Sequence, residues 1–230
     1  MLLKFKIDKE MDKKLIKEFL NTSIAGNDFS KSIIRLHPKM SNIKKLDNKI
    51  KEKEISDYVE KYYQINSFKI INKLKEIEIT WEKIEKRFFL EIKKLFNLNK
   101  ILSKNYISYF SIINACPRWI SKREFCIAYN LSIKKNIALI SHELLHFFFY
   151  EHINKDFRKK MTNMQKWHLS EIFNVIILNK NNFKQFFYPL KEEGYPEHEK
   201  ILKKFEEIYV KSNNLKEFID KSIIEIRQIY

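Results

Sequence analysis

Hydrophobic residues recur in steps of three and four between residues 70 and 95 and mark one face of a long helix. The positions are Ile70, Leu74, Ile77, Trp81, Ile84, Phe88, Ile92 and Leu95. Such a stripe packs against a core or against another helix. It also reaches the minimum length of a coiled-coil seam, which leaves open a homodimer through the N-terminal helices. The segments 9–20, 47–64, 197–211 and 214–229 are expected to be helical as well.

The pattern changes after Asn99. Segments 106–113 and 125–131 are rich in Tyr, Phe, Ile and Ser, and the first alternates partly with a period of two, so both are expected to be strands. Residues 115–119 between them are expected to form a loop, and apolar segments at 137–150 and 167–178 suit buried helices. The chain is therefore expected to be α+β and mostly helical, with a helical N-terminal region at 1–99 and a core with a small sheet at 100–230.

Composition narrows the possible functions. Only two glycines and four prolines occur in 230 residues, which disfavours an all-β fold and excludes Gly-rich phosphate-binding loops. The two cysteines, Cys116 and Cys126, do not form a dense disulfide framework, so a cytoplasmic location is expected, with a single disulfide between them as the alternative. Charged residues interrupt segment 1–8 too early for a signal peptide, and no apolar run reaches the length of a transmembrane span.

The net charge of +16 raises the question of an anionic partner. The excess is nearly all Lys, spread along the chain beside abundant Ile, Asn and Phe. Codon usage in an AT-rich genome would produce this composition, and there is no Arg-rich tract or RNA-binding signature. Nucleic acid is therefore not the expected partner.

Residues 142–146 read His-Glu-Leu-Leu-His, the HExxH pattern, within a segment expected to be helical. His142 and His146 would lie one turn apart on one face, so both imidazoles can reach one metal ion. Glu143 would lie beside that metal and act as general base on a metal-bound water. Chance alone would produce the pattern in roughly one such chain in seventy. The apolar residues around the pattern strengthen the case for a metal site, because a buried helix rarely contains paired histidines without a ligand or hydrogen-bond partner for them. The alternative is a core helix with two hydrogen-bonded histidines.

This segment resembles the zinc-binding helix of the zincin metallopeptidases, and the resemblance covers residues 124–178. It implies a zinc ion on His142 and His146, catalysis by Glu143, and a third protein ligand further along the chain. Glu171 is the leading candidate, because buried carboxylates are rare unless they are paired or bound to metal. Its position 25 residues after His146 also resembles the spacing in the glutamate-ligand, thermolysin-like zincins, or gluzincins. The alternative is a carboxylate that pairs with a nearby lysine or is exposed.

Three other residues compete for the third position. His152 falls where the metzincin pattern HExxHxxGxxH has its last histidine, but Phe149 replaces the glycine that turns the chain there. If the helix continues, His152 points away from the two motif histidines. His168 precedes Glu171 by three residues on the same face, so it could bind the metal or hydrogen-bond a ligand. Cys126 would correspond to the upstream cysteine of peptide deformylases, whose Gly-Cys-Leu-Ser surroundings are missing here.

Two further positions are candidates for supporting roles. Asn174 lies one turn beyond Glu171 and could orient a ligand. The resemblance to thermolysin-like enzymes implies a downstream Tyr or His that stabilises the oxyanion, and Tyr195 and His198 are the local candidates. The alternative for segment 194–198 is a plain loop in which Pro196 begins a helix.

The expected function is that of a zinc-dependent metallopeptidase, in which Glu143 assists attack of a zinc-bound water on a peptide or protein substrate. In zincins, the strand before the zinc helix commonly forms the sheet edge that aligns an extended substrate, and segment 125–131 has that place in the order. One alternative is a zinc hydrolase that acts on another amide or an ester. Another is a non-catalytic protein whose basic surface or helical N-terminal half binds nucleic acid or a partner.

Overall fold

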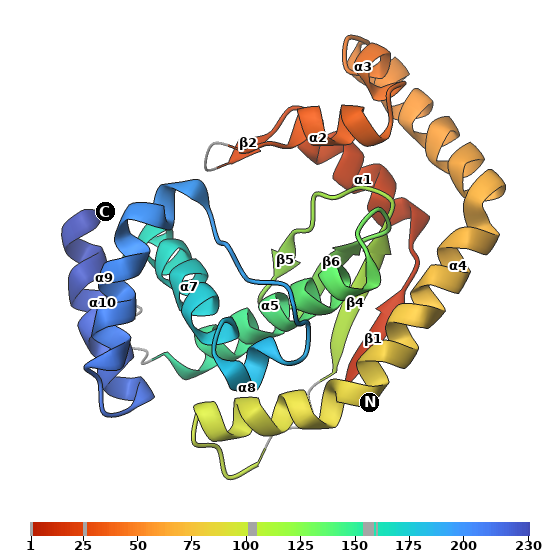
Figure 1. Cartoon of the computed structure of the whole chain (residues 1–230). Helices are drawn as coiled ribbons and strands as arrows, with labels where there is room; N and C mark the ends of the chain where they lie inside the picture. Colours follow the sequence, from red (N-terminus) through yellow and green to blue (C-terminus); the bar gives the residue numbers. More distant parts are fainter. Residues whose placement is uncertain (1, 25–26, 101–104, 154–158, 160) are drawn as a thin grey trace. The chain divides into compact units, whose positions relative to one another are not determined.

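The computed structural model describes residues 2–24, 27–100, 105–153, 159 and 161–230 (Figure 1). The chain divides into two compact units, Met1–Lys83 with Lys104–Asn136 and Ile84–Ser103 with Ile137–Tyr230. The described residues are mostly helical, with a small four-stranded sheet and a two-stranded sheet, which confirms the expected α+β class. The two units interleave along the sequence, whereas the expected division has one boundary between residues 99 and 100. That boundary stays a prediction.

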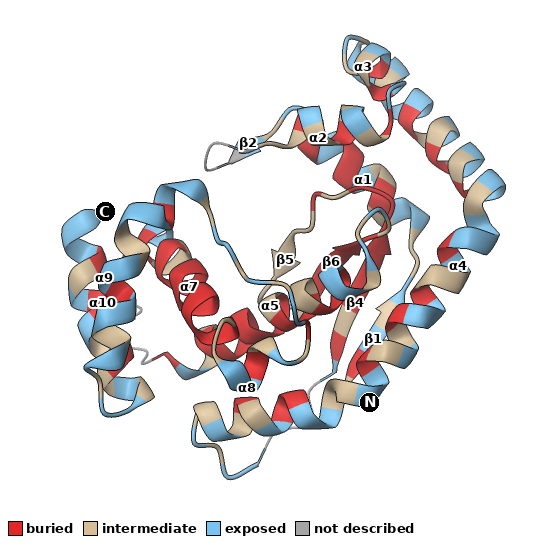
Figure 2. Cartoon of the chain, in the orientation of Figure 1, coloured by how far each residue is buried: buried red, intermediate tan, exposed pale blue. Residues whose placement is uncertain are grey.

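The first unit contains a four-stranded sheet in the order β1-β4-β6-β5. Strands β1 (Leu3–Lys6), β4 (Tyr106–Ser111) and β6 (Glu124–Ala128) run parallel, and β5 (Arg118–Trp119) pairs antiparallel to β6. Strands β4 and β6 are almost wholly buried, as expected of central parallel strands (Figure 2). The two predicted strands are therefore confirmed. The prediction of a loop at 115–119 is wrong for its last two residues, and β1 was not expected.

The same unit contains α1 (Lys9–Phe19), α2 (Phe29–Leu36), α3 (Met40–Ile43) and the two-residue strands β2 (Ser23–Ile24) and β3 (Asn27–Asp28). Helix α4 (Asn48–Leu95) joins the two predicted helical segments into one helix that begins in the first unit and ends in the second. Most of its predicted stripe is buried: Ile70, Leu74, Ile77 and Trp81 in the first unit, and Phe88 and Ile92 in the second. The periodic pattern therefore located a genuine core face.

The expectation that segment 125–131 forms the edge of the sheet is wrong. Strand β6 lies between β4 and β5, and β5 pairs with its first two residues. Beyond β5, the side-chain amide of Asn136 donates to the Ala128 carbonyl over 2.9 Å and accepts from the Ala128 N–H over 3.1 Å. This buried amide takes the hydrogen bonds that an added strand would use, so β6 cannot align an extended peptide in that way.

A buried carboxylate lies at the end of β4 in the first unit. Asp12 of α1 accepts hydrogen bonds from the Tyr63 hydroxyl, the Ser111 hydroxyl and the Ile112 N–H. Burial nevertheless outweighs these three bonds and raises the pKa of Asp12 from 3.8 to about 6. The fold therefore favours the neutral acid. The stability that this preference provides is fully present below pH 3.8 and is lost as the pH rises through about 6.

We expect Asp12→Asn to flatten the dependence of stability on pH. The amide keeps the shape of the neutral acid and does not ionise, so the variant should retain about 2–3 kcal/mol of unfolding free energy that the wild type loses between pH 4 and pH 7.5. Urea unfolding across that range measures it. Asp57→Asn, at an exposed position of α4, is the matched control and should follow the wild type. Parallel curves for Asp12→Asn and wild type would contradict the assignment.

The second unit is a helical assembly. It contains most of α5 (Ile133–His152), then α7 (Asn163–Leu178), α8 (Asn181–Lys184), the 3-10 turn η1 (Pro196–His198), α9 (Glu199–Val210) and α10 (Leu215–Ile229). Thr162 and Gln165 form a capping box that starts α7, and every residue from His168 to Leu178 is buried. The predicted buried helices and the two closing helices are thus confirmed. Among the described residues, no helix combines the length and apolar character needed to cross a membrane.

Candidate metal centre

The HExxH residues lie on α5 within the second unit. Because His142 and His146 are four residues apart on a helix, their rings face the same side, with centroids 4.6 Å apart. Their Nε2 atoms are 2.9 Å apart. His146 is fully buried, and the side chain of His142 is 12% exposed, so the pair opens toward solvent on the His142 side.

Helix α7 brings a carboxylate to the same point. One oxygen of Glu171, Oε2, lies 3.2 Å from Nε2 of His142, and the other, Oε1, lies 3.4 Å from Nε2 of His146. The side chain of Glu171 is only 2% exposed. The structure therefore brings together the three residues predicted as metal ligands, and their donor atoms all face one another.

Charges at this site are strongly coupled. Burial alone would raise the pKa of Glu171, but the adjacent His146 and His142 outweigh it and hold that pKa well below 4.5. Burial alone would likewise lower the pKa of His142, but Glu192 and Glu171 raise it well above 6.5. Two carboxylates around two imidazoles require a positive charge in this nearly dry environment. A proton on His142 supplies one such charge, and a divalent metal ion would supply it in full.

Glu192 was not predicted from the sequence. Its Oε1 lies 3.1 Å from Nδ1 of His142, on the side of the ring opposite to Glu171. A carboxylate in this position fixes the orientation of a histidine and makes the other ring nitrogen a stronger metal ligand. Asn179, the C-cap of α7, holds the Glu192 backbone by donating to its carbonyl over 2.8 Å and accepting from its N–H over 3.1 Å.

The segment that carries Glu192 lies directly on α7. Gly194 has a φ of +73°, which glycine adopts without strain. A Cβ atom at this position would lie 2.7 Å from Cγ2 of Val175, well inside van der Waals contact. One helical turn from Glu171, Asn174 donates to the His142 carbonyl over 2.8 Å. Asn174 therefore links α7 to the backbone of α5 at His142, and its role in orienting a ligand stays a prediction.

The donor set fits zinc. Two imidazole nitrogens and one carboxylate oxygen, with further positions left for water, are the ligands of many catalytic zinc sites. His142 also has the carboxylate partner that metal-bound histidines usually have. Glu143, the predicted general base, is adjacent to His142 in the sequence and is 3% exposed.

The competing ligands lie elsewhere. His152 packs on Phe96, with ring centroids 5.2 Å apart, and stacks on Phe148. Cys126 is buried in β6 of the first unit. His168 and the predicted oxyanion residue His198 contact each other, with Nδ1 and Nε2 2.9 Å apart, and Tyr195 packs against the neighbouring Trp167. Within the part of the chain that the structure describes, His168 and His198 belong to a second group of possible ligands.

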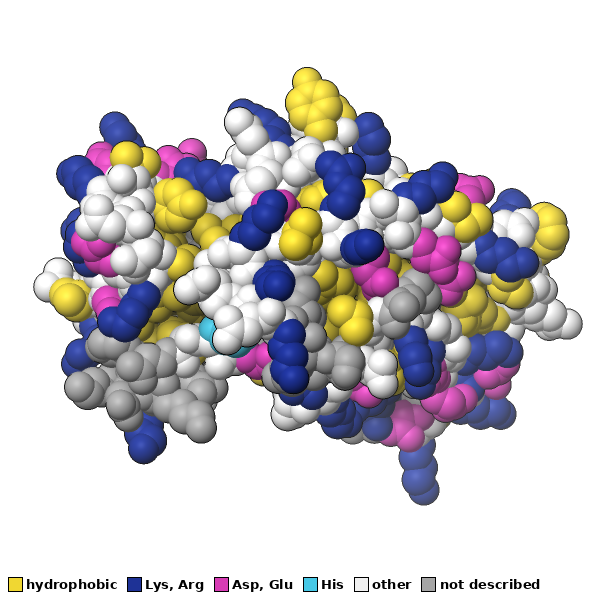
Figure 3. All heavy atoms as spheres, turned by 90° about the horizontal axis from the view of Figure 1, so that it is seen from below, with side chains coloured by type: hydrophobic (Ala, Val, Ile, Leu, Met, Phe, Trp, Pro, Cys, Tyr) yellow, Lys and Arg dark blue, Asp and Glu magenta, His cyan; other side chains and the backbone are white. Residues whose placement is uncertain are grey.

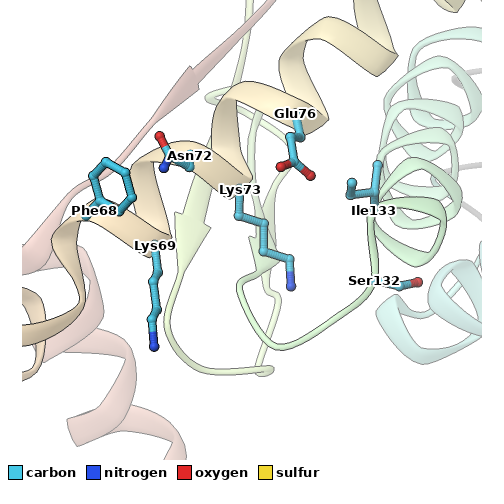
Figure 4. A pocket seen from close by; sticks show the side chains of 7 residues that line it. All are labelled: Phe68, Lys69, Asn72, Lys73, Glu76, Ser132 and Ile133. Atoms are coloured by element: carbon cyan, nitrogen blue, oxygen red, sulfur yellow. The ribbon is translucent and has the colours of Figure 1, made fainter.

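A surface pocket of about 490 Å³ lies in the first unit, between α4 and the start of α5. Figure 4 shows Lys69 and Lys73 extending from α4 on the side of Ser132 and Ile133. Lys73 already donates to the Tyr129 carbonyl over 2.6 Å. None of the predicted site residues lines this pocket, so it does not compete with the histidine site as a catalytic centre.

The chain matches no known family model, no curated protein and no solved structure. A functional assignment therefore rests on the side chains of the second unit and on the chemistry that they permit.

Proposed function

We propose that the protein is a zinc-dependent metallopeptidase with a zincin-like, gluzincin-type catalytic core. One observation carries this proposal. The Nε2 atoms of His142 and His146 lie 2.9 Å apart on an HExxH helix, and each lies within 3.4 Å of a carboxylate oxygen of Glu171. A cytoplasmic location and a peptide or protein substrate belong to the same proposal, and a homodimer through the N-terminal helices stays a prediction.

Zinc bound to these three residues would polarise the substrate carbonyl and make water acidic enough to attack at neutral pH. The carboxylate of Glu143 then accepts the proton of the attacking water and afterwards delivers it to the nitrogen of the leaving amine. Glu192 holds the ring of His142 through Nδ1, so that Nε2 stays directed at Glu171 and His146. These three glutamates therefore have separate roles: proton transfer, ligation and orientation.

Of the two predicted oxyanion residues, only Tyr195 enters the proposal. Its hydroxyl would donate a hydrogen bond to the negative oxygen that forms during attack. His198 is fully buried: its Nε2 lies 2.9 Å from His168, and its Nδ1 is buried with no hydrogen-bond partner among the described residues. Neither nitrogen of His198 is therefore available to a substrate oxygen.

Nucleic-acid binding is not part of the proposal. On the face drawn in Figure 3, Lys and Arg side chains are scattered among acidic, hydrophobic and other side chains and do not form a stripe. A basic track along one face is the usual electrostatic feature of proteins that bind a phosphate backbone. A scattered lysine surface is consistent with the composition-based explanation of the charge.

The direct test is digestion of a mixed peptide library by the zinc-loaded protein, with cleavage products identified by mass spectrometry. Cleavage should appear with zinc, disappear after chelation and return when zinc is added back. Complete inertness toward the library, with one zinc ion bound at the HExxH helix, would contradict peptidase activity. It would favour hydrolysis of a different amide or an ester at the same site.

A further inference from the structure

A second cluster of ligand-type side chains lies near the candidate metal centre but shares no residue with it. Nδ1 of His168 lies 2.9 Å from Nε2 of His198. Oε1 of Glu197 lies 3.4 Å from the first of these nitrogens and 3.7 Å from the second. Two imidazole nitrogens and a carboxylate oxygen thus converge, as they do at the HExxH helix.

Exposure increases across the cluster, from the buried histidines to the partly exposed carboxylate, as suits a small ligand that enters from solvent. His198 is fully buried, the side chain of His168 is 4% exposed and that of Glu197 is 36% exposed. The ring of Tyr230 stacks on His168 with a centroid distance of 3.6 Å and an angle of 9°. The two histidines therefore lie in the interior, and the partly exposed Glu197 carboxylate lies on the side of the cluster that faces solvent.

We infer that His168, Glu197 and His198 form a second binding site for a divalent transition-metal ion of the zinc class. Mixed imidazole and carboxylate ligands suit Zn²⁺ and its neighbours, whereas Ca²⁺ and Mg²⁺ prefer oxygen ligands alone. The site has one carboxylate fewer than the first, because Glu192 and Glu171 both contact His142. The inference does not depend on the peptidase proposal, since neither the residues nor the test involves catalysis.

The competing explanation is a plain hydrogen bond between two neutral imidazoles. One ring nitrogen would donate to the other, and Glu197 would contribute no more than a partly exposed charge. The two explanations differ in what Glu197 does. Its carboxylate is a ligand if a metal binds between the rings, and it is dispensable if the rings bind only each other.

The surroundings predict weaker binding than at the first site. A metal on Nε2 of His198 places the ring proton on Nδ1, which is buried and has no acceptor among the described residues. A buried donor without an acceptor costs about 1–3 kcal/mol. At the first site, the corresponding Nδ1 of His142 has the Glu192 carboxylate 3.1 Å away. A chelator should therefore remove the second ion first.

A metal ion at the second site would also fix the segment that carries Glu192, the carboxylate that contacts His142 at the first site. Glu197 and His198 belong to η1 on the same short stretch as Glu192 and Gly194, whereas His168 belongs to α7. A shared ion would tie η1 to α7 a few residues beyond Glu192. The Glu192 carboxylate would then be held against His142 from both ends of the segment, by Asn179 before it and by the ion after it.

Zinc stoichiometry of the purified full-length chain tests the inference. After demetallation and dialysis against excess zinc, elemental mass spectrometry should find two zinc ions per wild-type chain and one per Glu197→Gln chain. Glu197→Ala, which removes the side-chain oxygen altogether, should also bind one. Glu193→Gln, an exposed glutamate of the same segment, is the matched control and should bind two.

Variants of the first site keep the two proposals distinguishable. Glu171→Gln should bind one zinc ion, and the double variant Glu171→Gln/Glu197→Gln should bind none. Equal zinc content in wild type, Glu197→Gln and Glu197→Ala would overturn the second site, whatever Glu171→Gln shows. Loss of an ion with Glu197→Gln but not with Glu171→Gln would support the second site and contradict the first.

Discussion

Glu143→Gln is expected to bind zinc normally and to hydrolyse peptides about 10²- to 10⁴-fold more slowly, the range for loss of a general acid–base group. Glutamine keeps the size of the side chain and its place next to His142, but it cannot accept the proton of the attacking water. The loss should fall on kcat, because substrate binding does not use this proton transfer. The measurements are kcat and KM on the best peptide found in the library, together with the zinc content.

Glu151→Gln is the matched control for this variant. Glu151 is a second glutamate on α5, two helical turns beyond Glu143, and its replacement should leave kcat unchanged. If Glu143→Gln retains full turnover with zinc bound, Glu143 is not the base and the proposed mechanism fails. If Glu143→Gln loses zinc as well, its carboxylate acts on the metal site, and its assignment to proton transfer alone is wrong.

Glu171→Ala is expected to lower the affinity of the first site for zinc by more than about 100-fold. Loss of an indirect partner of a metal ligand already costs about 10- to 100-fold, and Glu171 is placed as a direct ligand. The variant also removes one of the two carboxylates that raise the pKa of His142, so this imidazole becomes harder to protonate. Competition with a chromophoric chelator measures the affinity, and zinc content confirms the stoichiometry.

Glu192→Gln separates ligation from orientation in the same assay. Its amide oxygen can still accept from Nδ1 of His142, so its loss of zinc affinity should be much smaller than that of Glu171→Ala. Equal zinc affinity in wild type and Glu171→Ala, with both proteins folded by circular dichroism, would show that Glu171 is not a ligand. The HExxH histidines would then need another third residue, and the gluzincin-type assignment would be wrong.

The sequence predicted the elements that a local hydrophobic period defines, such as the long helix. The stripe from Ile70 to Leu95 has one period over seven turns, so the C-terminal half of α4 followed from it directly. Strand β1 has only four residues, and its Leu3 pairs with Tyr106, which is 103 positions away in the sequence. No local hydrophobic pattern predicts this pairing. Strand β5 has two residues and is defined by its antiparallel pairing with the first residues of β6. These strands depend on pairing at long range, which sequence periodicity does not encode.

The residues of the candidate site likewise divide into those that the sequence predicted and those that it did not. Glu171 was predicted because an ionisable residue inside an apolar helix is unusual, and that anomaly is visible in the sequence itself. Glu192 carries no such signal, since it lies in a polar loop between Lys191 and Glu193. Its role depends on the double hydrogen bond from Asn179 and on the fit of Gly194 against Val175. The meeting of His168 with His198 likewise depends on how a loop returns to α7, which the spacing of these residues does not reveal.

Gly194 has a consequence for which sequence changes the protein can tolerate. Any side chain at this position would meet Val175 and push the loop away from α7. That single displacement would withdraw Glu192 from His142 and would also separate Glu197 and His198 from His168. The neighbouring Glu193 is exposed, so it should tolerate substitution. Position 194 beside it should tolerate almost none. Among related sequences, glycine at position 194 should therefore be more strongly conserved than the charged residues around it.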